Sequence, residues 1–363
     1  MACGMLAMQG AGVPVDRYVA FEIDKYAVQT SSHNFPRIEH RGDVFKADFK
    51  EFHGFDFLVG GSPCTYWSIA QKNNRETEAS GMGWELFQQY VRALHEAQPA
   101  HFIYENNKSM SNAIKESISS TFGFEPICIN SALVSAQNRQ RLYWVGKRNG
   151  DGTYSRVDVK QPEDRGILLR HILESYTSEA SYAFANMSAE PASVRLRGRD
   201  SGTKWEARVD KKAGTLDTIG ARSGMIAEPV RVGDIGSAAQ AHRVYSCDGK
   251  SVTLNAGGGG QGGKTGLYLC PVVCKDLRDI YEVRNGWITI KGQSYPIKLA
   301  DGFYIIRKLT VTECKRLQTV PDEYEFPVSN AQAYKMLGNG WTVEVIKHLI
   351  LSALTDDGDD WML

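Results

Sequence analysis

Residues 55–64, FDFLVGGSPC, carry the pattern on which the fold prediction depends. Residues 57–59 are apolar and partly β-branched, which favours a short buried strand. The next four residues, 60–63, favour a tight turn, because proline fixes its own φ and has no amide hydrogen to donate. A strand that ends in such a turn would lift the side chain of Cys64 into a cleft.

Similar apolar runs recur through the first part of the chain. Residues 18–21, 102–104 and 142–146 are short and rich in aromatic or β-branched side chains, whereas 24–33 and 84–97 have apolar residues at helical spacing. Strands that alternate with helices predict an α/β fold, with βαβ units around a mainly parallel sheet. In such a sheet the functional residues lie just past the carboxyl ends of the strands.

Changes in composition and in hydrophobic pattern divide the chain into segments. Residues 1–150 carry the alternating pattern, and residues 151–305 contain frequent glycines and turn pairs, most densely at 257–266, GGGGQGGKTG. Helical patterns return at 306–355, and residues 356–363 form an acidic tail. We expect one large domain built from the first and third segments and a smaller, loop-rich β domain between them.

Two helices are predicted in the third segment. Thr310 and Glu313 have the spacing of a capping box, in which the threonine caps the helix and the glutamate lies three residues further on. A second helix is expected from about Thr342 to Leu354, where apolar residues recur at helical spacing.

Composition limits the classes of function. The chain has 363 residues, with 42 Lys and Arg against 42 Asp and Glu. That balance argues against a strongly basic, non-specific nucleic-acid coat, although a basic face offset by an acidic one would still bind DNA. The seven cysteines include no CxxC pair, which favours a reduced, cytoplasmic protein without a disulfide scaffold or a metal site. No stretch approaches the roughly 20 apolar residues of a membrane span, and no signal-peptide pattern is present.

Two side chains in this pattern suit attack on a pyrimidine ring. Carbon 6 of cytosine is a poor electrophile and needs a thiolate, which Cys64 would supply. Glu105 follows the apolar run 101–104, and a carboxyl group at a strand end can hold N3 of the ring and make carbon 6 attackable. Taken singly, a cysteine such as Cys64 is more often a small buried residue, and Glu105 could equally cap a helix.

Two arginines stand at the start of the run 142–146. Side-chain alternation puts Arg139 and Arg141 on the same face of the predicted strand. Their guanidinium groups could hold a carbonyl, a phosphate or a catalytic carboxylate there. The alternative is a surface strand with basic residues.

In this order, the three elements resemble the catalytic signatures of the DNA cytosine-5 methyltransferase family. The family's Pro-Cys, Glu-Asn-Val and Gln-x-Arg-x-Arg stand here as Pro63-Cys64, Glu105-Asn106-Asn107 and Gln137-x-Arg139-x-Arg141. Asn107 replaces the usual valine and leaves the carboxylate in place. The resemblance implies a Rossmann-like catalytic domain that depends on S-adenosylmethionine. It also implies that the middle segment is a target-recognition domain for double-stranded DNA, in a protein that we expect to be monomeric.

The resemblance extends to the cofactor pocket. It implies that Glu22 and Ile23 contact the cofactor ribose, that Asp43 and Val44 contact its adenine, and that the motif around Trp341 returns to the same pocket. The full set of implied cofactor residues is Cys3, Gly4, Glu22, Ile23, Asp43, Val44, Pro63, Asn339 and Trp341. The tryptophan, together with the form VDRY at 15–18, also resembles animal de novo DNA methyltransferases.

One part of the family pattern is incomplete. The family opens with a strand and a Phe-x-Gly-x-Gly turn, whereas residues 1–4, MACG, resemble only the tail of that turn. We therefore expect either a reading frame that starts further upstream or a sheet without its first strand.

The family chemistry assigns a role to each catalytic residue. A cytosine flipped out of the duplex would be attacked at carbon 6 by Cys64 while Glu105 engages N3. Arg141 and Arg139 would hold the base or its flanking phosphate. Ser68, in the polar stretch after the nucleophile, could bind a phosphate, or it is a plain loop serine.

Three other classes of function are weighed against this one. A Rossmann oxidoreductase would need Gly-x-Gly-x-x-Gly after the first strand, and no such run appears near residue 1. The residues after Cys64, Thr-Tyr-Trp-Ser, do not resemble the tRNA-acting branch of the family. A catalytically impaired relative that only binds DNA stays open as the alternative.

Overall fold

The computed structural model describes residues 1–63, 66–68, 75–174, 194–199, 202–207, 227–236, 240–255, 265–271 and 280–356. Cys64, most of the glycine-rich run at 257–266 and the tail beyond Asp356 lie outside the described residues.

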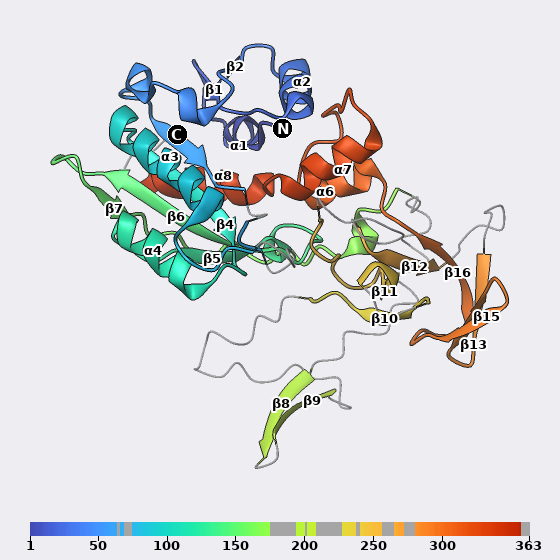
Figure 1. The fold of residues 1–363 in the computed structure, drawn as a ribbon. Helices are drawn as coiled ribbons and strands as arrows, with labels where there is room; N and C mark the ends of the chain where they lie inside the picture. The colour runs from blue at the N-terminus through green and yellow to red at the C-terminus, as the bar shows by residue number, and fades with distance from the viewer. Residues whose placement is uncertain are drawn as a thin grey trace.

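A five-stranded sheet forms the centre of the larger unit (Figure 1). Its strands run in the order β3-β4-β6-β5, with β7 paired to β6. Their bounds are β3 Phe57–Gly60, β4 His101–Asn107, β5 Ile127–Asn130, β6 Gln140–Arg148 and β7 Tyr154–Arg156. These strands and the helices between them confirm the α/β class predicted from the sequence.

The strand directions in this sheet are mixed, because β6 runs antiparallel to its neighbours. Strands β3 and β4 are parallel, whereas β6 is antiparallel to both β4 and β5. Helix α4 (Asn112–Phe122) carries the chain across from β4 to β5. Residues 131–139, by contrast, return directly from β5 into β6, and such a short connection permits only antiparallel pairing.

A second, smaller pair of strands lies near the N-terminus. Strands β1 (Val19–Ala20) and β2 (Glu39–His40) are parallel and form a sheet of their own. Helix α2 (Lys25–Asn34) connects them and completes a βαβ unit, of which the sequence predicts the first strand and the helix but not β2. Helix α1 (Cys3–Gly10) precedes this unit.

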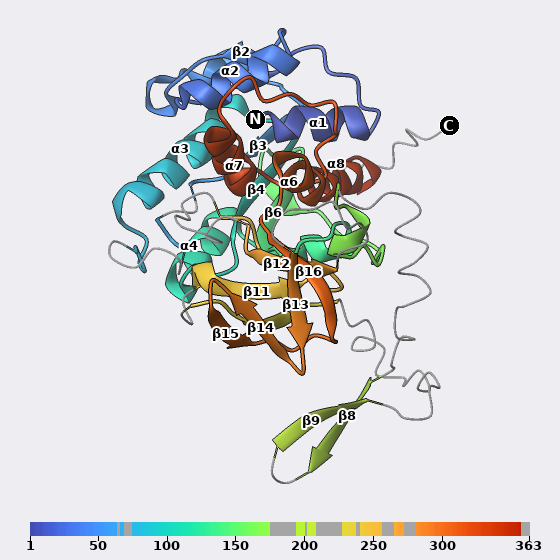
Figure 2. The same cartoon turned by 90° about the vertical axis from the view of Figure 1, so that its right-hand side faces the viewer.

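Helices cover both faces of the central sheet (Figure 2). Helices α3 (Gly81–Ala97) and α4 pack on one face around an aromatic cluster that includes Phe87, Phe102 and Trp144. Helices α1 and α8 (Val343–Asp356) pack on the other face. All seven residues of β4 are therefore buried, which accounts for its continuous apolar start.

The smaller domain is built on a seven-stranded sheet. The order of its strands is β10-β11-β12-β16-β13-β14-β15. Their bounds are β10 Arg231–Asp234, β11 Arg243–Ser246, β12 Leu267–Pro271, β13 Ile280–Arg284, β14 Trp287–Ile290, β15 Gln293–Pro296 and β16 Gly302–Arg307. A separate hairpin pairs β8 (Val194–Arg199) with β9 (Gly202–Ala207).

Strand β16 leads back into the larger unit through helix α6 (Val311–Leu317). Thr310 caps this helix and Glu313 completes the capping box, as the sequence predicts. Helix α7 (Asn330–Asn339) follows and precedes α8. Short 3₁₀ helices lie at Val44–Lys46, Phe49–Phe52, Ser131–Leu133, Leu169–His171 and Gln240–His242. None of the helices in the described ranges is long and apolar enough to cross a membrane.

Candidate active site

The turn after β3 packs directly against Glu105 on β4. Because β3 and β4 are parallel and Gly60 lies opposite Tyr104, the next residues of both strands emerge side by side. A methyl group at Gly61 would lie 2.3 Å from the main-chain oxygen of Glu105 and 3.4 Å from its Oε2. Only glycine fits at position 61, because any side chain there would prevent the close contact between the turn and Glu105.

Hydrogen bonds fix the same turn to the neighbouring strand. The hydroxyl of Ser62 bonds to that of Tyr104, and Asn106 Nδ2 donates to the main-chain oxygen of Ser62 at 3.2 Å. Burial raises the pKa of Tyr104, so its hydroxyl stays neutral. Pro63 is exposed at the end of the turn. Cys64 follows it and lies outside the described residues, but the turn that leads to it is anchored beside Glu105.

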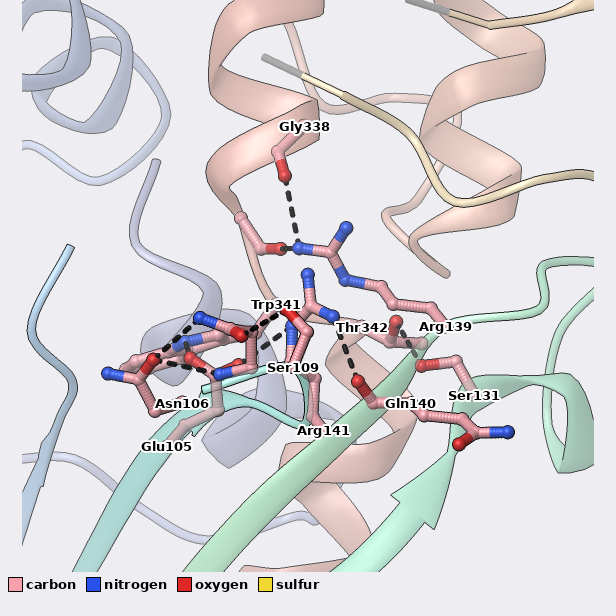
Figure 3. A network of polar contacts seen from close by, with 12 residues as sticks. Glu105, Asn106, Ser109, Ser131, Arg139, Gln140, Arg141, Gly338, Trp341 and Thr342 are labelled. Atoms are coloured by element: carbon pink, nitrogen blue, oxygen red, sulfur yellow. Dashed lines mark hydrogen bonds and ion pairs between the residues drawn. The ribbon is translucent and has the colours of Figure 1, made fainter. Parts of the chain in front are cut away.

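The carboxylate of Glu105 is held by donors from two other elements (Figure 3). Arg141 Nε on β6 lies 3.0 Å from Oε1. Trp341 Nε1, in the turn between α7 and α8, donates to Oε2 at 3.0 Å. Glu105 is only 8 % exposed, so both interactions lie in a largely dry site, where charge-assisted hydrogen bonds are strong.

The two arginines act at different places, although the sequence puts them on one face. Arg141 reaches Glu105. Arg139 is buried, and its guanidinium donates to the main-chain oxygens of Leu254, Gly338 and Gly340 at 3.0–3.3 Å. Arg139 therefore ties β6 to the turn that carries Trp341 (Figure 3).

Lys250 is a buried residue of this region that the sequence analysis did not single out. Its ammonium group donates to the main-chain oxygens of Ala132, Ser135 and Ile167 at 2.5–2.9 Å. Burial lowers the pKa of Lys250. The bonds hold the segment that leads into β6, and no local sequence pattern marks a lysine whose partners lie so far along the chain.

Carboxylates and exposed apolar side chains meet at the carboxyl end of the β1–β2 pair. Ala20 lies opposite His40 in parallel register, so Glu22 and Asp43 follow the two strands at the same edge. Glu22 Oε1 accepts from the amides of Ile23 and Asp24, and Asp43 Oδ1 accepts from that of Phe45. The adjacent apolar side chains are unusually open: Ile23 is 79 % exposed and Phe45 43 %, whereas Val44 is half-buried.

The start of α1 meets the turn before α8. A methyl group at Gly340 would lie 3.4 Å from Cys3 Sγ, and one at Gly4 would lie 2.6 Å from the Tyr18 hydroxyl. Burial raises the pKa of the Cys3 thiol, so Cys3 is an uncharged packing residue here. Asn339, the last residue of α7, is exposed.

Trp67 anchors one end of the polar stretch that follows Cys64. Its ring is fully buried and its Nε1 donates to Glu76 Oε2 at 3.0 Å. Glu76 also accepts from the amide of Gly83 at the start of α3. Ser68, next to this anchor, is half-buried.

Comparison with known proteins identifies the family. The family model for C-5 cytosine-specific DNA methylases matches residues 2–354. The chain belongs to this family. The orphan methyltransferase M.SPRI of Bacillus phage SPR is 26 % identical to it, over 94 % of this chain and 93 % of that protein. The type II methyltransferase M.HhaI of Haemophilus parahaemolyticus is 24 % identical, over 90 % of this chain and 84 % of that protein.

Solved structures show the same fold. The Dnmt2 methyltransferase of S. pombe superposes with a TM-score of 0.56 at 14 % identity, covering 98 % of this chain and 96 % of that one. A putative DNA modification methyltransferase encoded within an E. coli prophage gives 0.54 at 17 % identity, covering 97 % and 94 %. The Rossmann-like fold class inferred from the sequence is thereby confirmed.

The methyl donor of this family, S-adenosylmethionine, fits the β1–β2 edge of this methyltransferase. The carboxylates of Glu22 and Asp43 suit ribose hydroxyls and an adenine amino group, which are hydrogen-bond donors. The exposed side chains of Ile23 and Phe45 offer an apolar surface for a purine ring. Among the described residues no group of three or more His, Cys, Asp or Glu could hold a metal ion.

Proposed function

We propose that this methyltransferase transfers a methyl group to carbon 5 of a cytosine flipped out of double-stranded DNA, through a covalent bond between Cys64 and the ring. The observation that carries the proposal is the packing of the turn 61–63 against Glu105, whose carboxylate is oriented by Arg141. Cys64 directly follows this turn, so a ring that Glu105 holds by its N3 edge would lie within reach of the sulfur.

The steps follow from the chemistry of the ring. The Cys64 thiolate bonds to carbon 6, a proton held between the Glu105 carboxyl group and N3 neutralises the charge that reaches N3, and the displaced ring electrons make carbon 5 nucleophilic. S-adenosylmethionine supplies an electrophilic methyl group, which carbon 5 accepts. Loss of the carbon 5 proton to a base then expels the Cys64 thiolate and restores the aromatic ring.

The other predicted residues would orient Glu105, bind the DNA or hold the cofactor. We propose that Arg141 orients Glu105 and helps to hold the base, and that Arg139 acts on the site through Gly338 and Gly340 rather than by touching the base. Ser68 would bind a DNA phosphate, and the smaller domain would read the target sequence. The proposed cofactor set is Cys3, Gly4, Glu22, Ile23, Asp43, Val44, Pro63, Asn339 and Trp341.

Transfer of tritiated methyl groups onto cytosine-containing duplex DNA tests the proposal. The wild-type protein should incorporate label, Cys64→Ala should abolish incorporation, and Glu105→Gln should lower kcat by about 10²–10⁴-fold. Cys128→Ala is the matched control, because Cys128 is a half-buried cysteine on β5, and it should keep the wild-type rate.

A duplex with 5-fluorocytosine tests the covalent step itself. Fluorine at carbon 5 prevents the proton loss that releases the enzyme, so the protein–DNA adduct should persist and be detected by mass spectrometry at a peptide containing Cys64. DNA retention without transfer or adduct would favour the alternative, a relative that only binds DNA.

A further inference from the structure

Glu105 has one donor on each carboxylate oxygen, and the two donors lie 200 positions apart in the chain (341 − 141). Arg141 Nε lies 3.0 Å from Oε1, and Trp341 Nε1 donates to Oε2 at 3.0 Å. Family resemblance accounts for Trp341 only as a residue of the cofactor pocket. The contact with Glu105 assigns its indole N–H to the centre that would hold the cytosine.

Two donors on one carboxylate restrict its rotation. The terminal torsion of a glutamate side chain is broad and roughly two-fold, so a single ion pair with Arg141 would leave the plane of the carboxylate free to turn. A second donor on the other oxygen fixes that plane. Each oxygen still has a lone pair, so in a set direction the carboxyl group can accept from the exocyclic amino group of an incoming cytosine and share a proton with its N3.

The main chain on either side of Trp341 is itself fixed. The oxygen of Gly340 accepts from Arg139 Nη2 at 3.0 Å and from Gln318 Nε2 at 3.1 Å. The hydroxyl of Thr342 bonds to Gln318 Oε1 and to the Ser131 hydroxyl, both at 2.8 Å. Because the residues on both sides of the tryptophan are hydrogen-bonded to buried partners, the main chain that carries the indole is fixed in position relative to Glu105 (Figure 3).

We propose that Trp341 is a positioning residue that sets the plane of the Glu105 carboxylate for the pyrimidine edge. This inference rests on the proposed function for its consequence, but the hydrogen bond is testable without any activity. A tryptophan that served only as a wall of the cofactor pocket would affect cofactor binding and leave the carboxylate unchanged.

The indole N–H resonance of Trp341 tests the contact directly. In protein labelled with ¹⁵N-tryptophan, the resonance is assigned by its loss in Trp341→Phe. Glu105→Gln replaces the charged acceptor with a neutral amide, so this resonance should move upfield in the proton dimension. The indole resonance of Trp84, whose ring packs on Phe87 at 4.8 Å, should not move. An unchanged Trp341 resonance in Glu105→Gln would overturn the inference.

Steady-state kinetics test the consequence. Trp341→Phe keeps an aromatic ring and removes the donor, so kcat should fall about ten- to a hundredfold, while KM for S-adenosylmethionine changes less than about threefold. Trp84→Phe should retain wild-type values of both. A raised KM with unchanged kcat would overturn the inference in favour of a cofactor contact alone.

The failure of the proposed function has a different signature. In that case the wild-type protein itself would transfer no methyl group, and the Trp341 resonance would decide the inference alone. If Trp341→Phe does not fold, as judged by circular dichroism, Trp341→Tyr, which also removes the indole, assigns the resonance in its place, and the shift in folded Glu105→Gln still supports or contradicts the contact.

Discussion

The proposed catalytic centre around Glu105 and the proposed cofactor edge at the end of β1 and β2, which carries Glu22 and Asp43, hold their carboxylates in opposite ways. At the β1–β2 edge, Glu22 and Asp43 accept hydrogen bonds from amides one or two residues further along the chain. At the centre, Glu105 is held by Arg141, 36 positions away (141 − 105), and by Trp341, 236 positions away. The first arrangement is made by a local turn, whereas the second exists only once the whole domain has folded.

This difference determines what each region tolerates. A carboxylate held by its own turn keeps its place when distant parts of the protein change, and neighbouring side chains such as Ile23 are free to face a ligand. A carboxylate held by remote donors depends on every element that carries those donors. The centre should therefore respond to substitutions far from it, and the edge should respond only to substitutions within it.

Removal of the buried ammonium of Lys250 should give the largest effect on stability. Lys250→Met leaves three main-chain oxygens without their donor, and we expect the free energy of unfolding to fall by about 3–5 kcal/mol. Denaturant unfolding followed by circular dichroism measures this change. The exposed Lys298 provides the control, since Lys298→Met should cost less than about 0.5 kcal/mol. Equal stability of the two variants would show that the centre does not depend on remote contacts.

The same difference explains which features the sequence predicts. The predicted strands and helices and the capping box at Thr310 follow from spacing within a few residues, and the structure confirms them, although it also holds elements that the sequence pattern does not predict, such as α4 and β5. Glu22 is also recognisable locally, because it follows the predicted strand at 18–21, whereas Asp43 is identified only through the family resemblance. The different partners of Arg139 and Arg141 cannot be predicted from the sequence, because side-chain alternation puts both arginines on the same face. In the structure Arg139 donates to the α7–α8 turn, whereas Arg141 pairs with Glu105 on β4.

Three further features are not specified by the apolar pattern of the sequence. The antiparallel entry of β6 follows from the short return at 131–139, whose pairing the apolar pattern does not specify. The contact of Trp341 with Glu105 and the burial of Lys250 join segments more than a hundred residues apart. Spacing within a window of a few residues carries no information about such pairs.

At the cofactor edge, a truncated side chain should weaken binding without slowing the reaction. Ile23 is 79 % exposed and would be covered by bound S-adenosylmethionine, so Ile23→Ala loses apolar contact in both the ground state and the transition state. We expect KM for the cofactor to rise about five- to twentyfold with kcat nearly unchanged. Methyl-transfer kinetics at varied cofactor concentration measure both values. Val230→Ala, at an apolar residue 48 % exposed in the smaller domain, should leave KM for the cofactor unchanged, and a fall in kcat for Ile23→Ala would contradict the separation of the two regions.

The smallest expected effect lies where the cofactor edge touches the rest of the domain. Lys335 on α7 donates to Asp24 Oδ2 at 2.7 Å, and this bond lowers the pKa of Asp24, the N-cap of α2. A carboxyl group with a lowered pKa in the folded state stabilises the protein above its unfolded-state pKa, and this contribution is lost as the pH falls through the folded-state pKa. Both side chains are partly exposed, so the pair should contribute less than about 1 kcal/mol at neutral pH.

Asp24→Asn keeps a capping oxygen and removes the charge, which isolates the ion pair. A double-mutant cycle with Lys335→Met, measured by denaturant unfolding, should give a small coupling at pH 7 that vanishes as the pH falls below about 4. A coupling that persisted at low pH would mean that Lys335 acts by packing rather than by charge. A coupling of several kcal/mol would mean that the edge, like the centre, is held by a remote donor, and the distinction between a locally built and a remotely built carboxylate site would then fail in this methyltransferase.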